Sequence, residues 1–153
     1  YAQGLSAGLD AIIWYNFTSP NFHNSNLLNP NPSKKPFYWT YKTMTQELAG
    51  ARFNRTLGPG DFQQEGMEGY EFRLPSGKTK GVIWTTDGTT KTMLFPFSGL
   101  RVVDKNKYNS DGSLNASATR IIYDGKTGDL DGQGGNGVTI AIGPSPIYVE
   151  LYP

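Results

Sequence analysis

The 153 residues are enough for one domain, or for one domain joined to a fragment of another, and their formal net charge is only +1. That balance gives no electrostatic reason to expect nucleic acid or a membrane surface as a partner. No apolar run is long enough to span a bilayer, and the absence of cysteine excludes disulfides and thiol catalysis. The 13% aromatic content, with 19 Gly and 10 Pro, is typical of β-rich extracellular carbohydrate proteins and equally of ordinary β-sandwiches.

The first fifty residues alternate between helical and strand-like patterns. Small residues between Leu5 and Leu9 predict the last turns of a helix that ends near Gly8, so the chain is expected to begin within an element. The next stretch, Asp10–Phe17, is a nearly unbroken apolar run, which is typical of a strand buried on both faces in a parallel sheet. We expect Ala11–Phe17 to pair in parallel with another strand, either from the rest of a β/α barrel that would precede this chain or from the same segment of a neighbouring subunit.

A long polar loop and an amphipathic helix follow that strand. The loop covers Thr18–Lys34, and Ser33 is expected to cap a helix that carries Pro36 in its first turn and stops at Gly50. Four apolar residues are predicted to share the buried face of this helix: Phe37, Tyr41, Met44 and Leu48. Strand, long loop and helix form one repeat of a β/α barrel, in which ligands bind at the carboxyl end of the strand.

After Gly50 the pattern becomes that of short strands separated by turns. The predicted strands are Ala51–Leu57, Gly66–Leu74, Lys80–Thr86, Thr92–Phe97, Leu100–Asp104, Thr119–Tyr123, Val138–Ile142 and Ile147–Tyr152. Hairpin turns are expected at Pro75–Lys78 and at Asp87-Gly88. The predicted fold is mainly β: an antiparallel sandwich over residues 51–153, preceded by a terminal β/α unit of a (β/α)8 barrel over residues 1–50.

Four segments, taken in order, resemble a known family. They are Tyr1–Tyr15, Lys35–Met44, the pair Gly69–Arg73 and Gly81–Asp87, and Gly143–Glu150. They are similar to the seventh helix and eighth strand, the start of the eighth helix, and the first hairpin and last strand of the small sandwich in retaining barrel glycoside hydrolases. The resemblance implies that the chain is the C-terminal part of such an enzyme, with its sandwich buttressing a catalytic barrel.

The resemblance places both catalytic carboxylates outside this chain. In that family the acid/base glutamate ends the fourth strand and the nucleophile ends the seventh, and both would precede Tyr1. The retaining mechanism needs two carboxyl groups about 5–5.5 Å apart, and acids such as Asp61, Glu65 and Glu68 have no visible pairing in the sequence. We therefore expect no catalytic residue here, no cofactor, and glycosidase activity only together with the missing barrel.

A remnant of a sugar site is expected at the end of the Asp10–Phe17 strand. The resemblance implies that Trp14 floors the sugar subsite nearest the cleaved bond, with Asn16 and His23 as polar contacts, although the apolar run alone favours Trp14 as a core residue. His23 alone lacks the further ligands that a metal needs, so a surface loop is the simpler interpretation. Expected partners are a polysaccharide or oligosaccharide and the rest of the barrel, in a secreted, extracellular protein.

Other features have ordinary structural interpretations. Trp39 lies off the main helix stripe and is expected to pack against the sandwich, while Trp84 is expected in the sandwich core. Carboxylates in Asp124–Asp131 stand at turn spacing that a calcium ion could use, but a glycine-rich hairpin loop is favoured.

Two alternatives remain open from the sequence. The sandwich could itself be a carbohydrate-binding module, which would need coplanar exposed aromatics among Tyr70, Trp84 and Tyr108. The chain could also be a structural extracellular subunit that self-assembles through its exposed barrel strand.

Overall fold

The computed structural model describes residues 2–9, 26–29 and 33–151. Its elements are α1 (Ala2–Ser6), α2 (Pro36–Glu47), β1 (Arg52–Leu57), α3 (Pro59–Phe62), β2 (Met67–Arg73), β3 (Thr79–Thr85), β4 (Lys91–Phe95), β5 (Gly99–Asp104), η1 (Ala116–Ala118), β6 (Thr119–Tyr123), β7 (Val138–Ile142) and β8 (Ile147–Leu151). The predicted strand Asp10–Phe17 and its parallel pairing lie outside the described residues, as do Trp14, Asn16 and His23.

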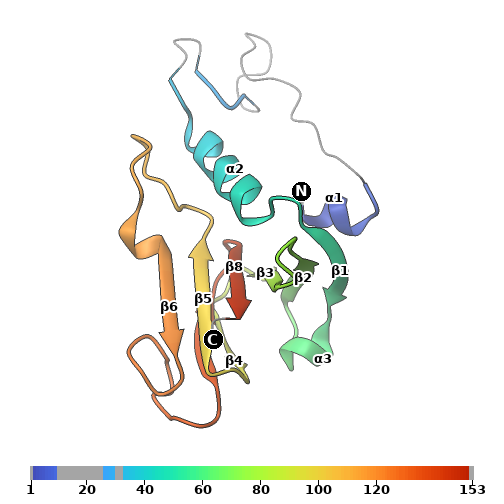
Figure 1. Ribbon diagram of the computed structural model, residues 1–153, viewed down its shortest axis with the longest axis vertical. Coiled ribbons are helices and arrows are strands. Elements are labelled where there is room, and N and C mark those ends of the chain that lie inside the picture. The colour runs from blue at the N-terminus through green and yellow to red at the C-terminus, as the bar shows by residue number, and fades with distance from the viewer. Residues whose placement is uncertain (1, 10–25, 30–32, 152–153) are drawn as a thin grey trace.

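In the described residues, eight antiparallel strands form two sheets of unequal size (Figure 1). The larger sheet has the order β1-β2-β3-β8-β5-β6, and the smaller one pairs β4 with β7. Every strand pairing is antiparallel, and the helices after Gly50 are the four-residue α3 and the three-residue η1. The predicted antiparallel sandwich is confirmed in the described part of the chain.

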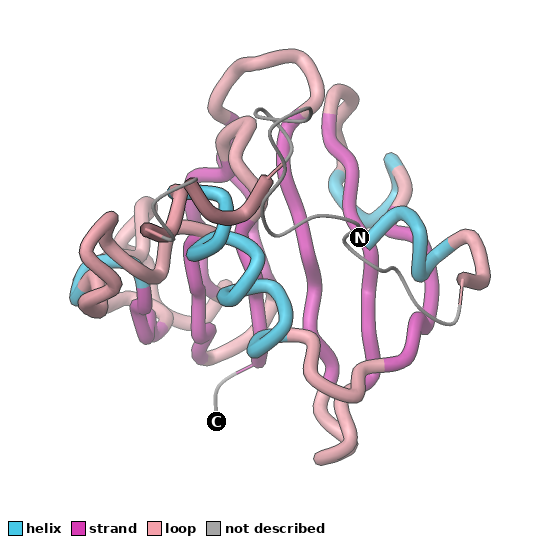
Figure 2. The backbone as a smooth tube through the Cα atoms, turned by 90° about the horizontal axis from the view of Figure 1, so that it is seen from above, coloured by secondary structure: helices cyan, strands magenta, loops and turns pink. Residues whose placement is uncertain are grey.

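The larger sheet has a packed cluster on each of its faces, because alternate residues of a strand point to opposite sides. Its inner face packs against the small sheet through a cluster formed by Phe62, Ile83, Phe95, Leu100, Val102, Ile122, Val138, Ile140, Ile142, Ile147 and Val149. Its outer face carries a second cluster, Leu48, Tyr70, Phe72, Val82, Val103 and Tyr148, against which α1 and the last turn of α2 pack. Figure 2 shows α2 in front of the strands of this sheet. The N-terminal helices therefore share a core with the sandwich.

One predicted hairpin is confirmed and two predicted hairpin connections are wrong. β2 and β3 pair along their length around Pro75–Lys78, with Gly77 at a φ of 83°. The turn at Asp87-Gly88 instead carries the chain from β3 in the large sheet to β4 in the small one, and the loop after Asp124 likewise leads from β6 to β7. Turn residues mark where the chain reverses, but they do not specify which strand becomes the pairing partner.

The predicted buried face of α2 is wrong in part. Phe37 is 56% exposed, and the fully buried stripe is Trp39, Thr43 and Glu47, with Leu48 following the helix. The stripe is rotated because a charged residue, Glu47, is turned towards the sheet, and an apolar pattern does not anticipate a buried acid.

The predicted N-cap of α2 is also wrong. Lys35 occupies the cap position without a side-chain cap, and the Ser33 hydroxyl accepts a hydrogen bond from the Asn29 side chain at 2.8 Å. Pro36 occupies the first turn as expected, since its missing N–H has no partner there in any helix.

The two tryptophans among the described residues, Trp39 and Trp84, are both packed. Trp39 is 7% exposed, and its Nε1 donates to the Ser110 carbonyl at 3.2 Å, so the predicted packing on the sandwich is confirmed. Trp84 is only half-buried, with its ring centroid 5.9 Å from that of Tyr70 on the outer face, so its predicted core position is confirmed in part.

Candidate functional site

Two features of the described residues carry chemistry. One is a buried cluster of charges between α2 and the outer face of the large sheet, and the other is a cleft on the inner face. Within residues 2–9, 26–29 and 33–151 no group of three or more His, Asp or Glu residues could hold a metal ion. No helix in the same residues is long and apolar enough to cross a membrane.

The charge cluster is centred on the Glu47 carboxylate at the end of α2. Its side chain is 4% exposed, and it accepts hydrogen bonds from Lys80 Nζ at 2.7 Å and from Arg101 Nη1 at 2.8 Å. Arg101 Nη2 completes a bidentate pair at 3.2 Å, and Lys107 Nζ approaches the same carboxylate at 3.0 Å. Three cations from β3, β5 and the following loop thus converge on one helix terminus.

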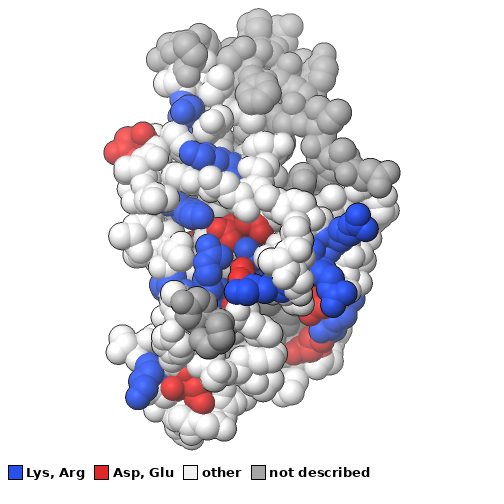
Figure 3. Space-filling view, viewed as in Figure 1, with Lys and Arg blue, Asp and Glu red and all other residues white. Residues whose placement is uncertain are grey.

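A second carboxylate balances part of this positive charge. Glu150 on β8 lies 3.2 Å from Lys80 Nζ and 3.8 Å from Arg101 Nη1. Lys80, which is 5% exposed, also donates to the Glu47 backbone carbonyl at 3.1 Å and so satisfies a carbonyl at the helix end. In Figure 3 acidic atoms lie among basic ones near the middle of the face shown.

The pKa of Glu47 results from two opposing effects. Burial raises this pKa. Hydrogen bonds from Arg101, Lys80 and Lys107 and the positive charge of Lys80 lower it by more, so the pKa falls from the ordinary 4.5 to about 2. The carboxylate therefore stays ionised and acts as a fixed anchor for cations, and it is not available as a proton donor near neutral pH.

This depressed pKa predicts a stability loss in acid. Because the folded-state pKa of Glu47 lies below its value in the unfolded chain, the unfolded chain binds the proton first. The contribution of Glu47 is complete above pH 4.5, falls progressively below that value, and is lost towards pH 2. The measurement is urea unfolding at several pH values for the wild type and Glu47→Gln; the difference between them should shrink across this window. A difference that does not change with pH would contradict the assignment.

The second feature is a cleft of about 430 Å³ between the two sheets. It exists because a two-stranded sheet covers only part of a six-stranded one. Its floor and polar wall are lined by four residues that are register partners on neighbouring strands of the large sheet: Arg55, Glu71, Gly81 and Val149. Gly81 lacks a side chain where its neighbours carry one, which hollows the floor of the cleft.

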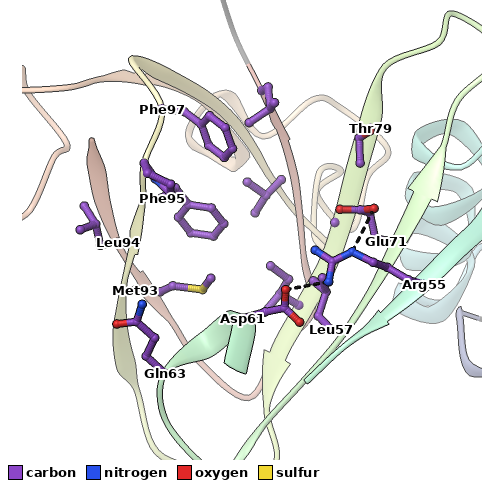
Figure 4. A pocket seen from close by; sticks show the side chains of 15 residues that line it. Arg55, Leu57, Asp61, Gln63, Glu71, Thr79, Met93, Leu94, Phe95 and Phe97 are labelled. Atoms are coloured by element: carbon purple, nitrogen blue, oxygen red, sulfur yellow. Dashed lines mark hydrogen bonds and ion pairs between the residues drawn. The ribbon is translucent and has the colours of Figure 1, made fainter. Parts of the chain in front are cut away.

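Figure 4 shows that the two walls of the cleft differ in character. Phe95 and Phe97 project from one side, while Arg55 stands on the opposite side between Asp61 and Glu71. Arg55 Nη1 lies 2.7 Å from Asp61 Oδ1, and its Nε lies 3.4 Å from Glu71 Oε1. The cleft is amphipathic, with an apolar aromatic wall facing a polar one.

Local sequence explains how α3 presents its part of the polar wall. Asp61 Oδ2 accepts from the Gly58 N–H at 2.9 Å, which closes the first turn, and the Phe62 ring packs over Gly69, where an added Cβ would stand 2.8 Å from it. Gln63 ends the turn at a φ of 55° and lines the cleft.

The polar wall is suited to binding and not to acid catalysis. The hydrogen bond from Arg55, followed by that from the Gly58 N–H, holds the pKa of Asp61 below its usual range, so Asp61 stays ionised at neutral pH. The sequence shows no pairing for this acid, and Arg55 and Glu71 were not expected at a site. Alternation in β1, which places Arg55 and Leu57 on one face, is the signal that could have found them.

The aromatic platform considered from sequence is not present on the sandwich. Tyr70 is 9% exposed, its ring plane is inclined by 39° to that of Trp84, and Tyr108 packs on Trp39 with centroids 5.6 Å apart. These three side chains therefore do not form a flat exposed surface for a polysaccharide.

The Asp124–Asp131 loop uses its carboxylates to hold its own backbone. Asp129 accepts from the Gly125 and Thr139 N–H groups, each at 2.8 Å, and Asp131 accepts from Gln133 N–H at 3.0 Å. These bonds shape a glycine-rich crossover between the sheets.

The fold defines a small antiparallel sandwich whose outer face is covered by N-terminal helices. Among solved structures, a family 39 glycoside hydrolase from the gut symbiont Bacteroides cellulosilyticus WH2 is similar to it, with a TM-score of 0.57 and 19% sequence identity. The similarity covers 90% of this chain and 25% of that chain, so this chain spans about a quarter of the hydrolase's length. No protein-family model matches, and no curated protein matches in sequence. At this identity the likeness establishes the fold alone.

Proposed function

We propose that this chain is the C-terminal part of a secreted glycoside hydrolase-like protein, in which the sandwich buttresses a catalytic barrel. Residues 1–50 would be the last β/α unit of that barrel and residues 51–153 the supporting sandwich. The observation that carries the proposal is the Glu47 cluster, which ties the end of α2 to three cations of the sandwich.

The packing around that cluster supports a rigid connection. Leu48 and Met44 pack on the outer face of the large sheet, and Trp39 inserts against the loop after β5, where an added Cβ on Gly112 would overlap its ring. A helix held at both its middle and its end cannot swing freely relative to the sheet. A sandwich can stabilise the last helix of a barrel only through a rigid contact of this kind.

The sugar contacts expected at Trp14, Asn16 and His23 belong to this proposal. They would sit at the carboxyl end of the last barrel strand, where the glutamates of the preceding strands would complete the site. The partner would be a polysaccharide or oligosaccharide bound by the whole barrel.

The proposal predicts that the 153-residue chain by itself does not hydrolyse aryl glycosides. Retaining hydrolysis needs two carboxyl groups about 5–5.5 Å apart at the sugar, and both are expected in the segment before Tyr1. Release of nitrophenol from aryl β-glycosides is the measurement. Turnover by the pure chain that a single Asp or Glu substitution abolishes would refute the proposal.

The buttressing role is tested on the polypeptide encoded by the gene that contains this chain. We expect a barrel with two strand-end glutamates before Tyr1, and we expect that deleting residues 51–153 lowers both the melting temperature and the soluble yield of that barrel. The matched control is deletion of the crossover loop residues 131–135 alone, which leaves the outer face intact. A barrel that keeps its melting temperature and kcat/KM without the sandwich would contradict this role.

A further inference from the structure

We propose that the cleft between the two sheets is a binding site for one or two neutral sugar units, separate from any site in the barrel. This inference goes beyond the proposed function, because a buttress needs no ligand of its own. It rests on the shape, lining and charge of the cleft, and each of these points to the same class of ligand.

The size of the cleft suits a small ligand. Its volume of about 430 Å³ lies within the roughly 300–1,000 Å³ typical of small-molecule sites. It is open at the edge of β4, where Leu94 and Phe97 remain 47% and 42% exposed. These two side chains extend the apolar lining of the cleft to its opening, and contiguous exposed apolar surface in a groove can mark a ligand site.

The two walls match the two kinds of surface on a sugar. A pyranose ring presents C–H groups on its faces and hydroxyl groups around its rim. Phe97, which is 42% exposed, offers most of the aromatic surface to a ring face, because Phe95 is only 8% exposed. Arg55, Asp61 and Glu71 offer charged hydrogen-bonding groups to the rim (Figure 4). Each acid already accepts one hydrogen bond besides its contact with Arg55, Asp61 from the Gly58 N–H and Glu71 from the Asn54 side chain. A carboxylate has about four acceptor sites, so both acids keep capacity for a ligand.

Gln63 adds a further polar group at the mouth of the cleft. Among the described residues, it is the one non-glycine residue with positive φ, at 55°, and no hydrogen bond to its side-chain amide is found there. A left-handed conformation costs a residue with a Cβ about 1–2 kcal/mol, which glycine would avoid. The amide therefore stands at a position where stability alone would favour glycine.

The charge balance of the cleft selects against ionic ligands. Arg55 is neutralised by two carboxylates, so the three groups together carry a formal charge of −1. A phosphate or carboxylate ligand would meet no unpaired cation, while a neutral polyol can both donate to the acids and accept from the guanidinium.

The cleft lies on the opposite side of the sheet from α1 and α2. Its floor residues Gly81 and Val149 point to the inner face, whereas Lys80 and Tyr148, their neighbours in sequence, point to the helices. A ligand here would therefore not compete with one bound at a barrel strand end.

The test is an NMR titration of the ¹⁵N-labelled 153-residue chain with cellotetraose, xylotetraose and mannotetraose, with inorganic phosphate as the anionic control. At least one tetrasaccharide should shift the amides of β3, α3 and the Phe95–Phe97 segment, and phosphate should not. If no tetrasaccharide shifts these amides, or if phosphate does, the proposal is wrong.

Two variants separate binding from folding. Gly81→Val should abolish the shifts, because the valine side chain fills the floor of the cleft. The variant should still fold, because an added Cβ meets Ile83 at an ordinary contact distance of 3.4 Å and β-branched residues favour strands. Gln63→Gly should keep or raise the melting temperature yet weaken binding several-fold, as expected for one lost hydrogen bond. Unchanged binding in both folded variants would overturn the assignment. Neither result bears on the deletion experiment for the buttressing role.

Discussion

Replacing Glu47 by alanine is expected to lower the free energy of unfolding by about 3–5 kcal/mol, the usual cost of breaking a buried ion pair from one side. The loss of stability arises because a cation that Glu47 pairs with stays buried in the variant. Lys80 is 5% exposed, and without Glu47 its ammonium group keeps, among the described residues, only Glu150 as a counter-charge, at 3.2 Å. Urea denaturation followed by circular dichroism measures the change, and hydrogen exchange should show faster exchange of the α2 amides in the same variant.

The matched control is Asp104→Asn, which breaks the exposed pair with Arg120. Its atoms are 3.1 Å apart, close to the distances around Glu47, but the two side chains are 48% and 40% exposed. Exposed pairs contribute about 0–1 kcal/mol, so this variant should differ little from the wild type. Adding Lys80→Met to Glu47→Ala should recover part of the loss by removing the stranded charge. If Glu47→Ala costs no more than Asp104→Asn, the network does not hold α2 to the sheet.

The charge network also shows what an apolar pattern leaves undecided. The spacing of apolar residues identified α2 and its approximate ends, because a helix of this length has one buried face in any fold. It did not identify the residues that are buried, since Glu47 is turned inward to meet partners from β3 and β5 that are 33 and 54 residues away in sequence. Long-range pairing of this kind leaves no local signal.

The strands were easier to predict than their partners. Alternation and turn residues located all eight strands to within about two residues, because both depend on short stretches of sequence. The sequence predicted a sandwich, but not which strands belong to which of its two sheets. The turn at Asp87-Gly88 and the loop after Asp124 look like hairpins locally. In the structure β8 pairs with both β3 and β5, while β4 and β7 pair with each other in the separate sheet.

The sites follow the same rule. Trp14, Asn16 and His23 follow from the family resemblance and stay predictions. The sequence pattern does not reveal the cleft, because its lining comes from β1, α3, β2, β3, β4 and β8 and includes Gly81, which contributes by having no side chain. A site assembled from six elements can be recognised only once their register is known.

The aromatic wall of the cleft depends on one glycine, and Gly137→Ala is expected to be the most damaging glycine substitution near it. Gly137 has a φ of 108°, and an added Cβ would overlap the Phe95 carbonyl oxygen and stand 2.8 Å from Pro96 Cα. Both are backbone atoms, which cannot rotate away as a side chain could. The free energy of unfolding should fall by about 1–3 kcal/mol from the conformation, and by about 1–3 kcal/mol more from the overlap.

Gly135→Ala measures the first of these contributions, the conformational cost, by itself. Gly135 has a similar φ of 93°, but an added Cβ there meets nothing within 4 Å, so only the conformational cost applies. The difference between the two variants in urea denaturation measures the close approach of Gly137 to the Phe95–Phe97 segment. Equal losses would mean that this segment yields to the added methyl group, and the aromatic wall would then be too mobile to present a fixed surface to a sugar ring. A larger loss in Gly137→Ala, accompanied by weaker tetrasaccharide shifts, would instead tie the rigidity of this wall to binding.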